Sequence, residues 1–463
     1  MKDLLKKFRL FNDSFKNRTG FNNTVSGFRS FAYRIKTINF SFLLNNFNSE
    51  DYFYWSVSDN NLSMLGIKSV FDIKISGLDR IEKTDSKILQ IENNVESNWH
   101  EVGLNFPPMF LGGMKFVPNE QGNVWNDFSD SDWMLPKFLF YKNNSEYFLI
   151  INYKSSTYDD SVLENEILEI TDFLTQTTNP AEQKNIQITS TIVHNGWNNK
   201  VLNALKSIHE GAIQKIVLSR EVEWELSGVP NIYSLIQKLG KRYPKCYVFA
   251  FRRNNSVFFG ASPEKLAKIQ NGWIETDALA GSISRSPNPK EDLKLEKELL
   301  SSEKNLNEQD AVVKFITGSL SKISDNIEFD EKPIIRKLPN IQHLWTPIRA
   351  KLNKELKLFS ILKNLHPTPA ICGAPWLNAL QSITMMEEHD RGLYAGIVGW
   401  FCLENKAEFA VAIRSALLKD KKVYGYAGCG IVEGSDPDAE YEETELKLKP
   451  IKNLFVNEKS RQS

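Results

Sequence analysis

Residues 426–447 read Tyr-Ala-Gly-Cys-Gly-Ile-Val-Glu-Gly-Ser-Asp-Pro-Asp-Ala-Glu-Tyr-Glu-Glu-Thr-Glu-Leu-Lys and join the glycine-rich end of a strand to an acidic helix. Gly428 and Gly430 allow a backbone to approach a ligand closely, and their N–H groups suit an anion. The sequence Ser435-Asp436-Pro437 predicts a helix start, because Ser and Asp are preferred N-caps and Pro suits the first helical turn. The pattern predicts a ligand-binding strand end followed directly by a helix.

Three charged residues of this predicted helix, Glu440, Glu443 and Lys447, share one face, because residues three and four apart lie one above the other. Two carboxylates beside an anion-binding loop favour a divalent cation that holds a negatively charged small molecule. The alternative is a solvated helix in which Glu443 pairs with Lys447. This segment alone does not decide between the two.

The composition favours a globular protein without a nucleic-acid or membrane partner. The chain has 463 residues, of which 41% are apolar and 25% charged, both close to globular averages. This length accommodates two or three ordinary domains or one large single-core enzyme. Lys+Arg and Asp+Glu are both 57, so no net charge attracts nucleic acid or a membrane surface.

Cysteine use and hydropathy predict a cytoplasmic protein. Its four cysteines form no CxxC pair, which favours reduced thiols over disulfides or a zinc site: Cys246, Cys372, Cys402 and Cys429. No apolar run approaches the roughly 18 residues of a membrane span. The first forty residues carry nine Lys or Arg against two Asp, which favours a basic, partly frayed N-terminus over the alternative of an organelle transit peptide.

The chain divides into a scaffold region, residues 1–190, and a region of sharper patterns, residues 191–456. The boundary is predicted in the polar, breaker-rich stretch Thr175–Lys184, and Phe110–Phe116 is interpreted as a turn. Helices are expected at 197–210, 231–241 and 290–322. Strands and helices mix without regular βαβ alternation, which predicts an α+β fold with strands that include Phe53–Val57, Met114–Val117, Tyr147–Tyr153, Lys215–Arg220, Tyr247–Phe251, Val257–Gly260, Gly396–Trp400, Glu408–Arg414 and Lys422–Ala427.

Two charged residues stand beside apolar strands where they could transfer protons. Lys215 opens a buried strand, where desolvation lowers the pKa of an amine and makes it available as a general base. Its alternative is an ordinary surface lysine. Glu264 follows a strand end and a Pro, where burial would let it donate a proton. Its alternative is a helix-start glutamate that interacts with the macrodipole.

Further polar residues could bind an anion or a metal. Gly281 and Ser282 offer donors that suit a carboxylate, although a plain turn explains them equally well. Glu308 precedes an apolar helical stripe and could equally be a solvated helix charge. His343 and His366 could be anion donors or hydrogen-bonded residues near a core.

These segments, taken together and in order, resemble the chorismate-binding enzymes over about residues 195–455. The family includes isochorismate, anthranilate, aminodeoxychorismate and salicylate synthases. The resemblance implies one large domain of the anthranilate synthase component I type, with two layered antiparallel sheets flanked by helices. Residues 1–190 would be its variable first part and residues 191–456 the catalytic region, where chorismate binds with Mg2+.

The resemblance also implies roles for individual residues. Glu308, Glu440 and Glu443 would ligate Mg2+, which would hold the ring carboxylate of chorismate. Residues implied in substrate contacts are Gly281, Ser282, His343, Ala370, Ile371, Arg414, Tyr426, Gly428 and Lys447.

Two positions indicate which reaction the resemblance implies. Lys215 stands where amine-adding members carry Gln, and Ala280 stands where aminodeoxychorismate synthases carry a nucleophilic lysine. Both favour water as the nucleophile and therefore an isochorismate synthase, in which neutral Lys215 activates water at C2 and Glu264 protonates the departing C4 hydroxyl. No glutaminase subunit is then required.

The expected pathway is menaquinone or phylloquinone synthesis, because the long N-terminal portion resembles that of the quinone-pathway enzymes. The alternatives are a siderophore-pathway isochorismate synthase, a salicylate synthase and, less favoured, an amine-adding synthase. Some positions depart from the family pattern. Asn305, Leu306 and Gln309 stand where related chains often have Asp, Arg and His, while Glu308 is kept, and Ser286 stands where Gly is common.

Overall fold

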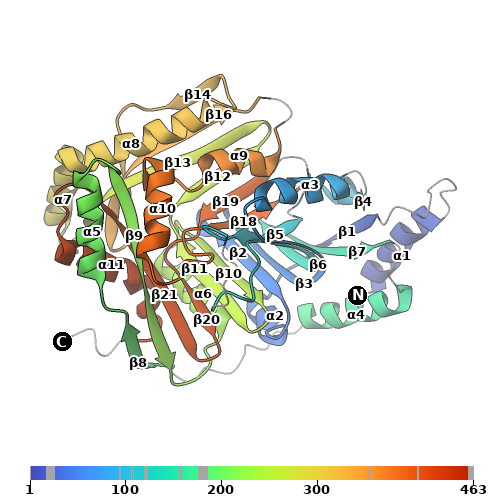
Figure 1. The fold of residues 1–463 in the computed structure, drawn as a ribbon. Coiled ribbons are helices and arrows are strands. Elements are labelled where there is room, and N and C mark those ends of the chain that lie inside the picture. Colours follow the sequence, from blue (N-terminus) through green and yellow to red (C-terminus); the bar gives the residue numbers. More distant parts are fainter. Residues whose placement is uncertain are drawn as a thin grey trace.

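The strands form one hydrogen-bonded network that divides into two layers at β6 (Figure 1). The computed structural model describes residues 2–16, 27–92, 95–105, 107, 109–118, 124–155, 159–175, 186–353, 356–403 and 406–456. Every pairing is antiparallel except that of β1 with β4. The predicted α+β class is therefore confirmed.

The first layer contains most of the strands on either side of the long β3 and β6. Its order is β4 (Val95–Ser97), β1 (Phe28–Ile35), β7 (Glu146–Lys154), β6 (Ser131–Asn143), β3 (Leu62–Ile75), β2 (Tyr52–Val57), β10 (Tyr247–Arg253), β11 (Ser256–Ser262), β20 (Ser415–Lys419), β21 (Lys422–Ile431) and β9 (Lys215–Leu226). Strand β9 also pairs with β8 (Ile188–Val193) and with the short β17 (Gly373–Ala374).

The second layer leaves β6 at its N-terminal end, where residues 131–134 pair with β5. Its order is β5 (Phe110–Met114), β18 (Ile397–Phe401), β19 (Ala407–Val411), β12 (Lys265–Gln270), β13 (Trp273–Ser284) and β16 (Ile341–Lys351), which also carries β14 (Asn326–Phe329) and β15 (Ile334–Lys337).

The α-helices and two short 3-10 helices, labelled η, cover these layers. They are α1 (Lys2–Lys16), α2 (Phe40–Asn46), η1 (Ser58–Asn60), α3 (Arg80–Glu92), η2 (Trp99–Val102), α4 (Asp160–Thr175), α5 (Trp197–His209), α6 (Ile232–Arg242), α7 (Pro289–Ser301), α8 (Glu303–Leu320), α9 (Leu358–Leu365), α10 (Trp376–Met386) and α11 (Pro437–Lys452). Among the residues described, no helix is both long and apolar enough to cross a membrane.

Alternate side chains of the central strands enter two different cores. Phe249 and Phe258 belong to a core shared by the two layers, whereas Val248 and Phe259 belong to a second core under helices α1, α2, α4, α6 and α11. Since successive side chains of a strand point to opposite faces, this division shows that the first layer is buried on both sides. Strands such as β2 and β11 are therefore apolar on both faces.

The strands of the predicted scaffold region pair directly with those of the later region. β2 pairs with β10 and β5 pairs with β18, so one sheet network includes strands from both sides of the expected boundary. Residues 176–185 of that boundary lie outside the described residues. The division near residue 190 stays a prediction.

Two expectations about local structure are wrong, and a third is confirmed with more detail. Phe110–Phe116 is not a turn: β5 covers Phe110–Met114, and the predicted strand at Met114–Val117 is displaced accordingly. The helical region expected at 290–322 is confirmed and consists of two helices, because Ser302 ends α7 and its side chain caps α8. The N-terminus is not frayed over residues 2–16, since α1 buries Leu4 and Phe8 in the second core.

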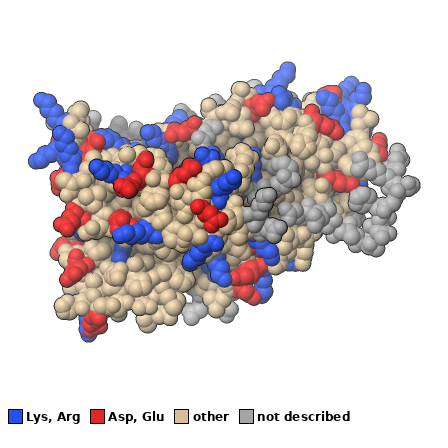
Figure 2. Space-filling model, turned by 90° about the horizontal axis from the view of Figure 1, so that it is seen from above, with Lys and Arg blue, Asp and Glu red and all other residues tan. Residues whose placement is uncertain are grey.

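The surface carries charge of both signs. On the face seen in Figure 2, Lys and Arg side chains are interspersed with Asp and Glu. The equal totals of acidic and basic residues agree with this distribution.

Close backbone packing explains why two glycines lie in the middle of β5. A Cβ atom on Gly112 would lie 2.0 Å from the carbonyl oxygen of Asp132. We expect Gly112→Ala to destabilise the protein by about 2 kcal/mol or more, because overpacking moves the backbone, and thermal unfolding followed by circular dichroism would measure it. Gly318→Ala, on the exposed side of α8 with nothing within 4 Å, is the control and should stabilise by up to about 1 kcal/mol. Equal melting temperatures for the two variants would contradict this explanation.

Candidate active site

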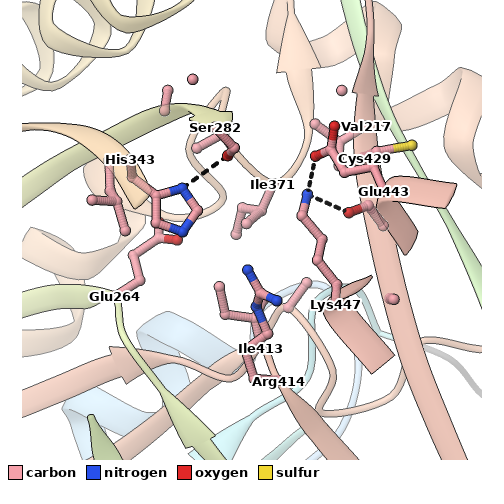
Figure 3. A pocket seen from close by; sticks show the side chains of 18 of the residues that line it. Val217, Glu264, Ser282, His343, Ile371, Ile413, Arg414, Cys429, Glu443 and Lys447 are labelled. Atoms are coloured by element: carbon pink, nitrogen blue, oxygen red, sulfur yellow. Dashed lines mark hydrogen bonds and ion pairs between the residues drawn. The ribbon is translucent and has the colours of Figure 1, made fainter. Parts of the chain in front are cut away.

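A cavity of about 220 Å³ brings together residues from β9, β13, β16, β21, α8 and α11 (Figure 3). Of the fourteen residues to which the family resemblance gives a catalytic, substrate-binding or metal-binding role, thirteen line it: Glu264, Gly281, Ser282, Glu308, His343, Ala370, Ile371, Arg414, Tyr426, Gly428, Glu440, Glu443 and Lys447. The exception is Lys215.

Lys215 lies directly behind the cavity wall. It is the first residue of β9, its side chain is 7% exposed, and its Nζ donates to Oε1 of Glu308 at 2.7 Å. A Cβ atom on Gly430 would lie 2.8 Å from Cε of Lys215, so the absence of a side chain there leaves room for the lysine. Lys215 therefore does not line the cavity itself, but its ammonium group is hydrogen-bonded to Glu308, which does.

Glu264 is buried on the opposite side of the cavity from Lys447 (Figure 3). Burial raises the pKa of this carboxyl to about 7, and Asp277 adds to the increase, while Arg336, Lys215 and Lys447 oppose it. The carboxyl therefore holds a proton close to neutral pH, as a general acid requires. The charge of Lys215 is close enough to act on it.

His343 and Ser282 form a hydrogen-bonded pair on neighbouring strands. They are partners in the β13–β16 ladder, and the Ser282 hydroxyl lies 2.8 Å from Nδ1 of His343 (Figure 3). Burial lowers the pKa of the imidazole well below its usual value, with Arg414 and Lys447 adding to this. The ring is therefore neutral at physiological pH. Its Nε2 makes no hydrogen bond within the described residues and is available to a ligand.

The face of α11 that was predicted from its spacing does line the cavity. Lys447 donates to Glu443 at 2.6 Å and to the carbonyl of Gly428 at 2.8 Å. Burial opposes ionisation of Glu443, but the charge and hydrogen bond of Lys447 lower its pKa overall. Burial raises the pKa of Glu440, whose carboxyl accepts a hydrogen bond from Ser435 at 2.7 Å.

Arg414 brings an unpaired positive charge into the cavity wall. Its residue is 7% exposed, and its backbone adopts a left-handed conformation with φ of 53°. Burial lowers the pKa of the guanidinium, and among the described residues it makes no hydrogen bond or ion pair with another side chain. An unpaired buried charge is costly, so this position favours an anionic ligand.

Arg391 also lines the cavity and was not predicted from the sequence. Arg391 pairs with Glu387 through two hydrogen bonds of 2.8 and 2.6 Å. It also donates to the carbonyls of Ile371 at 3.0 Å and Val217 at 2.7 Å, which ties the loop before β17 to β9. The signal was present as an acid and a base four residues apart, but it indicates an ordinary helix pair equally well.

His366 is not among the residues that line this cavity. Its Nε2 lies 2.8 Å from the carbonyl oxygen of Ala395, and burial lowers its pKa to about 4. The alternative interpretation, a hydrogen-bonded residue near a core, is correct for this histidine.

The carboxylates of the cavity have the donor chemistry that a magnesium ion requires. Glu308 from α8 and Glu440 and Glu443 from α11 offer hard oxygen ligands to one cavity. Within the described residues, no three acidic, His or Cys side chains already stand close enough to hold an ion. Glu308 and Glu443 are paired with Lys215 and Lys447 instead.

Comparisons with known proteins agree on one family. Residues 17–456 match the family model described as chorismate binding enzyme. The chain is 32% identical over 415 residues to isochorismate synthase MenF of Bacillus subtilis, covering 88% of each chain. It is 33% identical over 379 residues to a salicylate biosynthesis isochorismate synthase of Pseudomonas aeruginosa, covering 78% of each. The structure of MenF, the menaquinone-specific isochorismate synthase from Escherichia coli, superposes with a TM-score of 0.79 at 23% identity, covering 96% of this chain and 99% of that one.

The raised pKa of Glu264 makes stability depend on pH in a defined direction. Folding raises this pKa from 4.5 to about 7. The contribution of the Glu264 carboxyl to the free energy of unfolding is therefore fully present below pH 4.5 and is lost as pH rises through 7. Relative to wild type, Glu264→Gln should therefore gain stability over this window and reach a plateau of about 3 kcal/mol above it. Urea unfolding at several pH values measures the difference. The exposed Glu433→Gln is the control, and a difference that stays constant from pH 4.5 to 8 would contradict the burial of Glu264.

Proposed function

Since the chain belongs to the chorismate-binding enzyme family, we propose that it is an isochorismate synthase, which isomerises chorismate to isochorismate. One observation supports this particular reaction among those of the family. Glu264, a buried carboxyl that keeps its proton near pH 7, faces the cavity on which the Lys215–Glu308 pair converges. An acid and a base around one small-molecule cavity are what this isomerisation needs.

The cations of the cavity suit a substrate with two carboxylates. Arg414 lacks a partner side chain within the described residues, and Lys447 already donates to a backbone carbonyl and a carboxylate. In the proposal these two groups bind the carboxylates of chorismate, and His343 and Ser282 add hydrogen bonds. Ala370 and Ile371 cover the apolar side of the ring.

The reaction adds water at C2 and removes the hydroxyl at C4. Neutral Lys215 takes a proton from the attacking water, and Glu264 gives its proton to the departing hydroxyl, so that one water enters and one leaves. The double bonds of the ring shift between the two positions. Lys215 is an ammonium group in its pair with Glu308. In the proposal it must therefore leave Glu308 and release a proton to solvent before it acts, as the neutral amine, on the water.

Mg2+ is the proposed cofactor, with Glu308, Glu440 and Glu443 as its ligands. When bound, the ion would neutralise the ring carboxylate of the substrate. The three carboxylates support this assignment through their oxygen donors and their shared cavity.

We also propose a role in menaquinone or phylloquinone synthesis, in the cytoplasm and without a glutaminase subunit. The alignment with MenF of Bacillus subtilis covers 88% of this chain, so it includes much of the long N-terminal portion on which the pathway expectation rests. A reaction that uses water as the nucleophile needs no source of ammonia.

Product analysis tests the proposed reaction directly. The purified protein with chorismate and Mg2+ should form isochorismate, and Lys215→Ala and Glu264→Gln should each lower kcat by about 100-fold or more, the usual contribution of an acid or base. Lys314→Ala is the matched control, since its side chain is 76% exposed on α8. Aminated product with added ammonium, or salicylate with pyruvate, would assign another reaction, and wild-type rates in both variants would reject the mechanism.

Metal removal tests the proposed ligands. EDTA should abolish turnover and Mg2+ should restore it, while Glu308→Gln and Glu443→Gln should raise the Mg2+ concentration needed for half-maximal rate by about 10-fold or more, because each loses a charged ligand. Titration calorimetry with Mg2+ alone provides a second measurement. The exposed Glu303→Gln on α8 is the control. Full activity in EDTA would remove magnesium from the proposal.

A further inference from the structure

Two amide side chains of α8 hold the backbone of β13 on both sides of Gly281. Asn305 Oδ1 accepts a hydrogen bond from the backbone N–H of Ser282 at 3.3 Å. Gln309 Oε1 accepts from the backbone N–H of Ala280 at 2.9 Å. Asn305 and Gln309 are four residues apart and therefore lie on the same side of the helix. We call these two residues the amide clamp.

The clamped segment is a bulge that lines the cavity. The β13–β16 ladder shifts register between Ala280 and Ser282, and Gly281 between them has φ of 70°. A Cβ atom on Gly281 would lie 3.0 Å from Cβ of Asn305, so α8 packs closely against the bulge. A bulge interrupts regular pairing and redirects the chain, so it needs partners outside the ladder.

Gln309 provides such partners with both its amide oxygen and its amide nitrogen. It is 2% exposed, and its Nε2 donates to the carbonyl of Ala278 at 3.0 Å and to Oγ1 of Thr346 at 3.1 Å. An apolar side chain here would leave the N–H of Ala280 buried without a partner, which is unfavourable. Gln309 therefore links α8 to both β13 and β16.

Asn305 provides the other contact without adding charge. Its own Nδ2 donates to Ser302 Oγ at 2.7 Å, which fixes the side chain at the capped start of α8. A carboxylate at this position could accept the same hydrogen bond from Ser282. It would also place a negative charge beside the bulge where the substrate carboxylate is proposed to bind.

We propose that Asn305 and Gln309 are positioning residues, which hold the Gly281–Ser282 bulge in a fixed place relative to Glu308. Glu308 lies between them in the sequence, so the clamp joins the carboxylate-binding bulge and the proposed metal ligand into one unit. The proposal rests on the proposed function for its kinetic consequence. The geometry itself can be tested without substrate.

The kinetic test compares Asn305→Ala, Gln309→Leu and the double variant with wild type. Each single variant should raise KM for chorismate by about 10-fold, the cost of roughly one hydrogen bond, with kcat within about twofold of wild type. The double variant should raise KM by less than the product of the two single effects, because both amides hold the same bulge. Asn307→Ala, exposed on the same helix, is the matched control and should leave KM unchanged.

The substrate-free test measures hydrogen exchange over residues 278–284. Asn305→Ala and Gln309→Leu should speed exchange of this segment, whereas Asn307→Ala should not, and Asn305→Asp should protect it as in wild type because the acceptor is kept. Wild-type exchange and wild-type KM in both clamp variants would overturn the proposal. If Gln309→Leu does not fold, Asn305→Ala decides alone. If wild type does not convert chorismate, the proposed function fails while the exchange experiment still tests the clamp.

Discussion

Ion pairing of partly buried carboxylates is the constraint on which this cavity depends. Lys215 pairs with Glu308, which connects β9 to α8. Lys447 pairs with Glu443 within α11 and also donates to the Gly428 carbonyl, which connects α11 to β21. Removing a carboxylate from water is costly unless a cation accompanies it. The pairs therefore allow α8 and α11 to bring acidic residues to a cavity enclosed by apolar strands.

The sheet network explains how these distant segments meet. Strand β21 lies beside β9, so the Gly428–Gly430 segment lies next to the first residues of β9, where Lys215 begins the strand. The second layer brings β13 and β16 to the same cavity from the opposite side. The two faces of the first layer are buried in two separate cores. The polar residues of the cavity therefore lie at the ends of the strands.

The sequence was most informative where chemistry and spacing coincide in one short segment. The strand end of β21 and the helix start and shared face of α11 were predicted correctly, because a helix period and a cap determine them locally, while their ligand-binding role stays a prediction. Contacts between distant segments were not predictable in the same way. The Lys215–Glu308 pair joins residues 93 apart, and the strand at Gly112 depends on how closely the Asp132 backbone approaches. The break between α7 and α8 at Ser302 was not predicted, because the helical spacing of apolar residues continues from one helix into the next.

Two carboxyl groups of the cavity show how one environment supports opposite roles. Burial acts to raise the pKa of both Glu264 and Glu443, although the pKa of Glu443 is lowered overall, so burial alone cannot distinguish them. Lys447 acts to lower the pKa of both carboxyls. It outweighs burial at Glu443, to which it is hydrogen-bonded, but not at Glu264, where Asp277 reinforces the effect of burial. Glu443 is thereby kept ionised, as its proposed role as a metal ligand requires, and Glu264 keeps a proton, as its proposed role as an acid requires. A single cavity can therefore hold an ionised ligand and a protonated acid at the same pH, and the lysine on α11 separates the two.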